Sequence, residues 1–317
     1  MPSTKNLTDL EEMSLLKLKL RQEMYEKQIQ NQLLDSLTSI YGEMTKIYDK
    51  YAVNGLLTKV EMTKYNKYQT MEKQIIDKLD PAIKANIKTI AKLLPEQYQE
   101  SFFHYAWAID NATGLRLSWG LVNQKSLLMP FDITNPKNIE LQNALHNYGI
   151  DAKKAIRRAL LNNLSQGKSL AQMAKDIKLS VKKIESSALT IARTEGMRAL
   201  NSGQDYTYLQ AEEMGIQGNR VWSATKDQKT REDHRLMDGE SPQEDGLYHL
   251  PNGDTMLYPM DFSQGADASE IINCRCTERF EIEGYSPQLM RTREEGVIPY
   301  QSYQSYAEEY HPDWLEE

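Results

Sequence analysis

The sequence predicts an α+β protein in which long, mainly helical N-terminal and middle regions precede a small, loop-rich α+β module. Apolar residues recur every three or four positions over most of residues 6–214, as they do in amphipathic helices. Beyond this stretch, turn-forming residues become frequent and separate short runs that are typical of strands. The 317 residues are enough for two domains with a sizeable core.

Residues 6–54 are predicted to form one long helix, which Asn54-Gly55 is expected to end. The apolar residues that carry this pattern are Leu10, Met13, Leu16, Leu20, Met24, Ile29, Leu33, Leu37, Ile40 and Tyr41. A second helix is predicted over 57–79. Because proline suits the first turn of a helix, Pro81 and Pro95 are expected to begin two further helices.

The region 1–110 is therefore predicted to be a helical hairpin or bundle. A long, thin helical array exposes much surface per residue, so this region is the predicted contact with partner subunits. Residues 111–136 are rich in Gly, Pro and Asn and are interpreted as a linker.

Residues 137–215 are predicted to be helical again, with a first helix over 137–165. Ser169 and Gln172 have the spacing of a capping box for a short helix that reaches about residue 177. Ser180 is expected to cap a separate, long docking helix that runs to about Met214.

The α+β module is predicted over 216–284, with a short helix near 231–238. Its expected strands are 219–225, 246–250, 255–258 and 274–283. The acidic, Tyr-rich tail, 285–317, is expected to be extended and to contribute little to a core. Its four tyrosines at helical spacing are interpreted as a face that docks on a partner, with core packing as the alternative: Tyr300, Tyr303, Tyr306 and Tyr310.

The net charge of −7 is unevenly distributed. Residues 101–200 hold 14 Lys and Arg against 7 Asp and Glu, whereas residues 201–317 hold 9 against 24. An acidic region does not favour wrapping nucleic acid. The basic middle is interpreted either as a DNA-facing surface or as a solvated helix face, the reading that its spread along helices favours. Its basic residues are Lys153, Lys154, Arg157, Arg158, Lys168, Lys175, Lys178, Lys182 and Lys183.

Targeting and redox signals are weak in this sequence. No apolar run approaches the ~20 residues that a membrane span requires, and the N-terminus has no apolar core of a secretory signal. The two cysteines, Cys274 and Cys276, are too few and too close to indicate a disulfide framework. We therefore expect no membrane association, and folding in a reducing cytoplasm.

The segment from Trp222 to Cys276 carries the most information about function. Both cysteines lie at its end, and one of the five histidines, His234, lies in the polar block that opens it. That block also contains Thr225, Asp227, Arg231 and Asp238. So dense and varied a set of polar side chains indicates groups with specified partners in an ordered loop-rich structure.

The order of these residues resembles the head-morphogenesis family of tailed bacteriophages typified by protein F of phage Mu. The resemblance covers about residues 165–280. The matching residues are Ala192-Arg193-Thr194-Glu195, then Trp222, Thr225, Asp227, Arg231, His234, Asp238 and Gly239, and finally Pro259, Asp261, Gly265, Glu270 and Asn273 through Cys276.

The resemblance implies a minor head protein of the virion, placed in the head interior or at the portal vertex. It implies assembly in the host cytoplasm and binding to the phage portal protein. Scaffolding protein and major capsid protein are further candidate partners. Phage DNA is a candidate ligand of the basic middle region, and the protein is a candidate to accompany the DNA at ejection. Two alternatives remain open: an enzyme of ADP-ribosyltransferase-like or nuclease-like type, and a DNA-binding accessory protein. The sequence contains no Walker motif, dinucleotide fingerprint, H-E-x-x-H or serine elbow, so the non-enzymatic interpretation is favoured.

Three groups of candidate site residues follow from this segment. Arg193 and Glu195 are interpreted as part of a helix that docks on the module, with a catalytic pair as the alternative. Asp227, Arg231 and His234 lie at i, i+4 and i+7, so a turn followed by a helix would place them on one side. Asp227 is the expected N-cap of that helix. Together with Thr225 and Asp261, these residues are interpreted as a structural polar network, with a ligand or active site as the alternative.

Cys274 and Cys276 form the third group. On a strand, residues two apart share a face and lie about 7 Å apart, which is long for a disulfide. Two thiols and an imidazole are suitable zinc ligands, with His234 or His249 completing the set. The favoured interpretation is no cofactor, with two small buried thiols and Arg275 facing outward, and zinc is the alternative.

Overall fold

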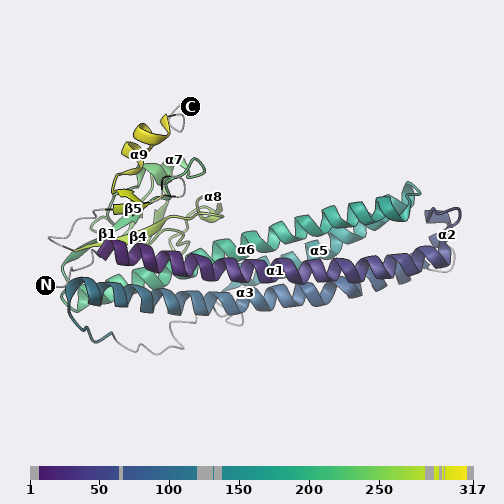
Figure 1. The fold of residues 1–317 in the computed structure, drawn as a ribbon, viewed down its shortest axis with the longest axis horizontal. Coiled ribbons are helices and arrows are strands. Elements are labelled where there is room, and N and C mark those ends of the chain that lie inside the picture. Colours follow the sequence, from purple (N-terminus) through teal and green to yellow (C-terminus); the bar gives the residue numbers. More distant parts are fainter. Residues whose placement is uncertain are drawn as a thin grey trace. The chain divides into compact units, whose positions relative to one another are not determined.

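The computed structural model describes residues 7–63, 67–119, 131, 138–282, 289–292, 295 and 297–312. Four long helices dominate it: α1 (Leu7–Tyr51), α3 (Lys67–Thr113), α5 (Ile139–Ser165) and α6 (Leu170–Glu213). Figure 1 labels these helices together with the short helix α2 (Lys59–Thr63). The small strands and helices that follow α6 make the protein α+β, so the predicted fold class is confirmed.

The module after α6 is built from short strands paired in twos. Strand β1 (Gly218–Ser223) pairs antiparallel with β4 (Thr277–Ile282), and β2 (Tyr248–His249) pairs with β3 (Thr255–Met256). Helices α7 (Glu232–Leu236) and α8 (Ala268–Ile271) lie in the loops between these strands. All four strands were predicted, each longer than observed. In the β1–β4 ladder, the last residue of β1, Ser223, is opposite the first residue of β4, Thr277.

The chain divides into two compact units, each built from segments that are separate in the sequence. Unit 1 contains residues 1–22, 94–131 and 193–317, and unit 2 contains residues 23–93 and 132–192. Helices α1, α3 and α6 each contribute one segment to both units. The predicted N-terminal region, 1–110, is thus shared between the units. Most of the predicted linker, 111–136, lies outside the described residues.

Unit 2 is helical. Its core contains Ile29, Leu33 and Ile40 of α1 and Ile156 and Leu160 of α5, all fully buried. Ser169 and Gln172 form the predicted capping box, since each backbone N–H donates to the other side chain. Gly167, with a φ of +60°, lies in the turn that follows the end of α5 at Ser165.

The prediction that Pro81 and Pro95 begin new helices is wrong, because α3 continues through both. An interior proline removes one helical hydrogen bond. The apolar pattern continues in register across both positions, however, and the side chains that carry it are buried. They are Ile75, Leu79, Ile83, Ile90, Leu93, Leu94, Tyr98 and Phe102. Packing of this face therefore outweighs the local signal. Asp80, the residue before Pro81, forms ion pairs with Lys84 and Lys153.

The prediction that Ser180 caps a separate helix is also wrong. Helix α6 is continuous, and the Ser180 hydroxyl donates to the Asp176 carbonyl 3.1 Å away, within the helix. Met173, Ile177, Val181 and Ile184 are buried on both sides of this position. The same burial argument as for α3 explains the result.

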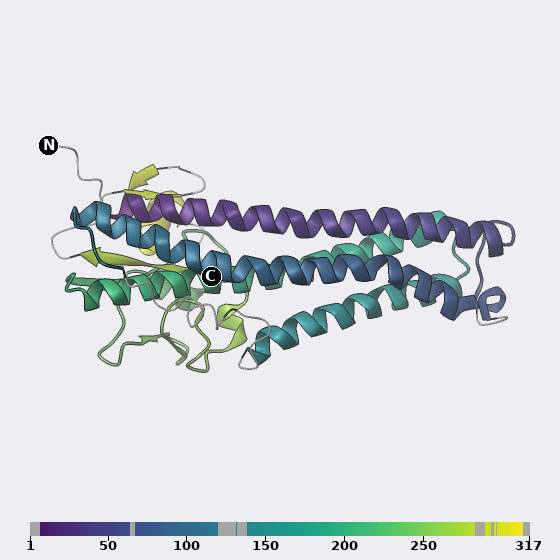
Figure 2. The same ribbon diagram turned by 90° about the horizontal axis from the view of Figure 1, so that it is seen from below.

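In unit 1, the start of α1 and the end of α3 run side by side, as Figure 2 shows. The Ser14 hydroxyl of α1 donates to the His104 carbonyl of α3, and Gln97 of α3 donates to the Leu18 carbonyl of α1. Gly203 allows α6 to approach α3 closely, because a Cβ at this position would overlap the Tyr98 carbonyl oxygen. The buried rings of Tyr105, Tyr208 and Phe280 connect these helices to β4.

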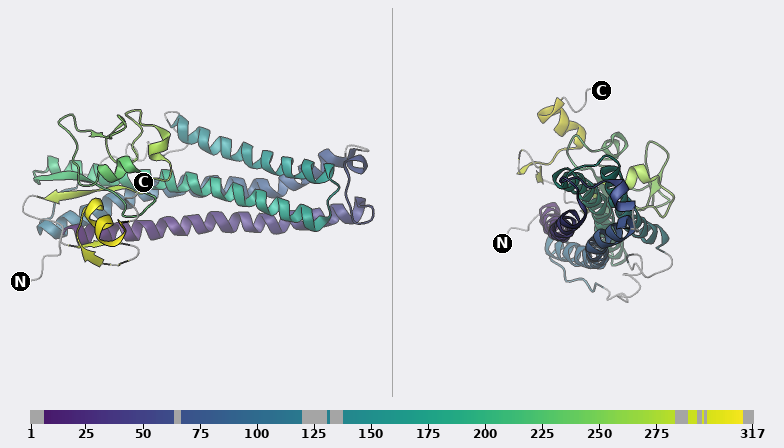
Figure 3. Two further views of the ribbon diagram at one scale, coloured as in Figure 1. Left: turned by 90° about the horizontal axis from the view of Figure 1, so that it is seen from above. Right: turned by 90° about the vertical axis from the view of Figure 1, so that its right-hand side faces the viewer.

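The tail belongs to unit 1, and its Tyr face packs on its own chain. After β5 (Leu289–Arg291) and β6 (Val297–Pro299), helix α9 (Tyr303–Tyr310) follows; Figure 3 shows these last segments in yellow. Tyr303 and Tyr306 are each only 1% exposed. The interpretation of this face as a partner-docking surface is therefore wrong for these two residues, and the core-packing alternative holds. The tail is polar overall, and Tyr303 is buried because it packs on the module, where it is bonded to Asp238 and Asp227.

Candidate functional site

The thiol–imidazole cluster of the module consists of His234, Cys274 and Cys276. His234, on α7, is 1% exposed, and both cysteines are also buried. Its Nδ1 atom lies 3.4 Å from Cys274 Sγ and 3.6 Å from Cys276 Sγ. The donor atoms of the three residues all lie within 4.8 Å of one another. The structure thus brings together the three residues that the sequence marked as metal-ligand candidates.

The two cysteines do not lie on a strand, contrary to the prediction. Strand β4 begins at Thr277, and Asn273 before the cysteines has a φ of +58°, in the left-handed region. The backbone therefore bends at Asn273-Cys274, and the sulfurs lie closer than the predicted ~7 Å of regular strand geometry. The N–H of Cys276 donates to Cys274 Sγ at 3.4 Å. An asparagine tolerates this conformation better than most residues do.

The other side of the His234 ring faces Glu270 of α8. His234 Nε2 lies 3.0 Å from Glu270 Oε2, within ion-pair distance, although neither atom makes an aligned hydrogen bond to a described residue. The ring also contacts Trp222 edge to face, with ring centres 5.2 Å apart, and Trp222 contacts Tyr248 in the same way. These rings and the carboxylate fix the position of the imidazole.

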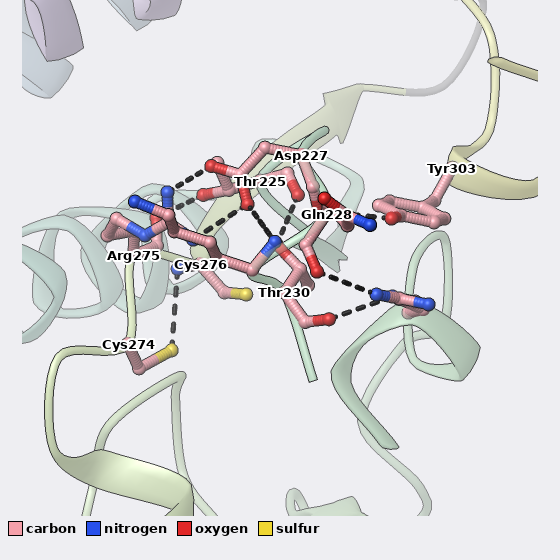
Figure 4. Close-up of polar contacts among 10 residues, drawn as sticks. Thr225, Asp227, Gln228, Thr230, Cys274, Arg275, Cys276 and Tyr303 are labelled. Atoms are coloured by element: carbon pink, nitrogen blue, oxygen red, sulfur yellow. Dashed lines mark hydrogen bonds and ion pairs between the residues drawn. The ribbon is translucent and has the colours of Figure 1, made fainter. Parts of the chain in front are cut away.

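Asp227 binds Arg275 through both carboxylate oxygens, as Figure 4 shows. Two predictions are therefore wrong. Asp227 is not the N-cap of α7, since the helix begins at Glu232 with Arg231 in the cap position. Arg275 does not point away from the module, because a bidentate carboxylate is a stronger partner than water. The i, i+4, i+7 argument failed because residues 227–231 are not helical.

The charges of this pair shift each other's pKa. Burial acts to raise the pKa of Asp227, but hydrogen bonds and charge from Arg275 outweigh it and hold the pKa below its usual value. In the cluster, the hydrogen bond from Cys274 and the neighbouring His234 lower the pKa of the Cys276 thiol against the effect of burial. The hydrogen bond with Cys276, together with burial, raises the pKa of the Cys274 thiol.

Other predicted residues hold the backbone around the cysteines. The Thr225 hydroxyl donates to the Arg275 carbonyl at 2.8 Å, and Arg231 donates to the Ile272 carbonyl at 2.6 Å. Thr194 of α6 accepts a hydrogen bond from the N–H of Asn273 at 3.1 Å. The predicted polar network thus contacts main chain on both sides of Cys274.

Arg193 and Glu195 lie in different environments. Arg193 is exposed, whereas Glu195 accepts two hydrogen bonds from Arg198. The Arg198 guanidinium in turn lies over the rings of Phe131 and Phe262. This part of α6 packs on the module, as a docking helix would.

Asp261 and Asp238 each stabilise a loop. Asp261 accepts hydrogen bonds from the N–H groups of Leu257 and Ser263. Asp238 accepts from the N–H of Ala224 and forms an ion pair with Lys226, whose pKa is lowered by burial. Asp238 also accepts from the N–H of Tyr303, and the Tyr303 hydroxyl donates to the Asp227 carbonyl, so the tail is anchored on the polar segment.

Sequence reasoning missed a set of buried amides and acids behind the cluster. Asn201 of α6 donates to the carbonyls of Pro259 and Cys276, at 2.7 and 2.9 Å. Gln204 donates to the Glu278 carbonyl and to the Tyr208 hydroxyl, which donates to Glu11 of α1. The one signal in the sequence was the i, i+3 spacing of Asn201 and Gln204 on an otherwise apolar helix face, and this spacing does not identify their distant partners.

Comparison with known proteins places these residues in a family pattern. Residues 154–279 match the model of the family described as Phage Mu protein F like protein. The chain is 28% identical over 277 residues to Minor head protein GP7 of Bacillus phage SPP1, covering 84% of this chain and 85% of that protein. It is also 28% identical over 225 residues to NAD(+)--arginine ADP-ribosyltransferase EFV of Enterococcus faecalis. That match covers 70% of this chain but 44% of the Enterococcus protein. No solved structure matches the chain.

Proposed function

We propose that this chain, which belongs to the phage Mu protein F-like family of bacteriophage minor head proteins, binds the portal protein while the head is assembled. Its role in phage head morphogenesis follows from the family. Beyond this general role, we propose binding to the portal and a position in the head interior or at the portal vertex. Scaffolding or major capsid protein are the next candidates for the same contact.

The observation that carries the proposal is an exposed apolar stripe on α1. Met13, Leu16 and Leu20 are 42%, 45% and 52% exposed and follow helical spacing. These residues were part of the predicted apolar pattern of the first helix, but the buried face of α1 is formed by others, which include Leu7, Leu10 and Leu18. A contiguous exposed apolar surface of this kind is typical of a protein–protein contact.

Aromatic residues of α3 extend the stripe within unit 1. The Lys17 ammonium, on the same face of α1, lies 5.9 Å from the ring centre of Trp107. Trp107 and Phe103 are 42% and 48% exposed. Aromatic side chains contribute strongly to interface energies, so α1 and α3 together offer a suitable contact for another head protein.

The geometry of the module supports a structural role over the enzymatic alternative. His234 is buried and faces thiols and Glu270, and the carboxylate of Glu195 is bound by Arg198. These are the arrangements of a packed loop scaffold. No described helix combines the length and the apolar character that a bilayer span would require.

Contact with DNA through the basic middle is less well supported. Lys153 pairs with Asp80, Arg157 with Glu72, and Lys168 with Asp176. Such pairs reduce the positive charge that is available to phosphates.

A pull-down with the portal protein of the same phage tests the proposal. The double variant Leu16→Lys/Leu20→Lys should lose most portal binding, because two charges would be buried at the contact. Leu179→Lys on α6 is the matched control, since Leu179 is also exposed (53%) but lies off the stripe. His234→Ala should retain binding if the helices make the contact. Portal binding by the double variant at the wild-type level would refute the proposed surface, and absence of portal binding by the wild type would refute the partner.

A further inference from the structure

We propose that His234 Nδ1 and the Sγ atoms of Cys274 and Cys276 bind one zinc ion, which cross-links α7 to the segment before β4. The zinc would join His234 to two cysteines that lie 40 and 42 residues further along the chain. The proposal concerns the stability of the module and does not depend on which head protein the chain contacts.

The first argument is the distance between donors. Zinc binds thiolate sulfur at about 2.3 Å and imidazole nitrogen at about 2.0–2.1 Å, so the S–N edge of a zinc tetrahedron is about 3.6 Å. The observed separations from His234 Nδ1 are 3.4 Å to Cys274 Sγ and 3.6 Å to Cys276 Sγ. Both sulfur–nitrogen separations are therefore nearly those that one ion requires, and all three donor atoms lie within 4.8 Å of one another.

The second argument is that hydrogen bonds alone do not satisfy this arrangement. Glu270 faces Nε2 of His234, and a carboxylate favours the tautomer with the proton on Nε2. Nδ1 then has a single lone pair, yet two thiols face it. A metal ion uses that lone pair and both sulfurs at once.

The third argument is the surroundings of the donors. Metal-ligating histidines usually face a carboxylate with their other nitrogen, as His234 faces Glu270. The N–H of Cys276 points at Cys274 Sγ, a bond that a thiolate accepts better than a thiol.

Burial and charge agree with zinc. All three ligands are buried, and two thiolates together with Zn²⁺ have no net charge, whereas two buried thiolates alone would be strongly disfavoured. Three protein donors leave the fourth position of the tetrahedron for a solvent molecule. His249, the alternative third ligand from the sequence, is exposed and paired with Asp245, so His234 is the ligand that the structure assigns.

Elemental analysis of the full-length protein, purified with reductant, should give one zinc per chain. After chelation, cobalt(II) should restore one equivalent and show thiolate-to-cobalt charge transfer with the d–d bands of a tetrahedral site. Protein with reduced, intact thiols that binds neither metal would overturn the proposal. So would a Cys274–Cys276 disulfide in the protein as isolated, detected as the loss of two hydrogens by mass spectrometry.

Variants assign the ligands. Cys276→Ser should abolish stoichiometric zinc, and Glu270→Gln should weaken zinc binding by about 10–100-fold, as loss of such an orienting group usually does. His249→Gln, the matched control, should retain one zinc, and loss of the metal in this control would refute the assignment. If Cys276→Ser fails to fold, a mercurial thiol reagent provides the test in the wild type. One zinc should be released for every two thiols titrated, and zinc retained after both thiols have reacted would overturn the site.

Discussion

Asn201 provides the sharpest test of how α6 holds the cysteine segment. Its side chain is fully buried, and its amide donates to the carbonyls of Pro259 and Cys276. Asn201→Ala removes the side-chain amide that donates both hydrogen bonds. The carbonyls of Pro259 and Cys276 would then lack this partner inside unit 1. A buried group that loses its partner costs about 1–3 kcal/mol, so we expect a loss of about 2–5 kcal/mol in the free energy of unfolding.

Urea unfolding measures the global effect, and hydrogen exchange of the β4 amides measures the local one. Asn111→Ala is the matched control, because Asn111 is exposed and donates one hydrogen bond within the last turns of α3. Its cost should be within about 0.5 kcal/mol. Asn201→Asp should be at least as harmful as Asn201→Ala, since a carboxylate would face two carbonyl oxygens. If Asn201→Ala changes neither stability nor exchange in β4, α6 does not hold this segment through Asn201.

Three further predictions concern other parts of unit 1. Burial raises the pKa of Glu11 to about 8, so folding favours its protonated form, and the free energy of unfolding should fall as the pH rises from about 4.5 to about 8. Glu11→Gln should remove this part of the pH dependence, measured by urea unfolding at several pH values. A variant whose stability depends on pH as the wild type's does would contradict the prediction. Gly203→Ala should cost about 1–3 kcal/mol by thermal unfolding, because its Cβ would overlap the Tyr98 carbonyl, and a neutral result would mean that α3 and α6 can separate freely there. Tyr303→Ala should expose α9 to limited proteolysis, since Tyr303 is 1% exposed, whereas a tail as resistant as in the wild type would show that other contacts suffice.

The fold class and the long helical stretches could be predicted because the apolar pattern is local. The turn at Asn54-Gly55, shortly after α1 ends at Tyr51, and the capping box at Ser169 are encoded within a few residues, and the structure has both. Pro81 shows the limit of the same reasoning. Its local preference for a helix start is real, but the cost of an interior proline is smaller than the gain from burying the continuous face of α3.

The site was predictable in its residue types but not in its pairings. His234, Cys274 and Cys276 could be singled out because they are rare and are the types that bind metals. The partner of Asp227 could not be predicted, because Arg275 lies 48 residues away in the sequence while Arg231 had the attractive helical spacing. The sulfur geometry depends on the positive φ of Asn273, which a propensity argument for a strand does not anticipate.

The contacts of the motif residues also bear on what the likeness to an ADP-ribosyltransferase means. Thr194, Thr225 and Arg231 bind main-chain groups of residues 272–275, and Asp227 binds Arg275. In this chain these residues therefore specify how a loop is folded beside two thiols. More than half of the Enterococcus protein lies outside its match with this chain, since only 44% of it is covered. Activity assigned to that whole protein need not reside in the matched part. The contact surface proposed for this chain lies on α1 and α3, outside the loop that these residues fold.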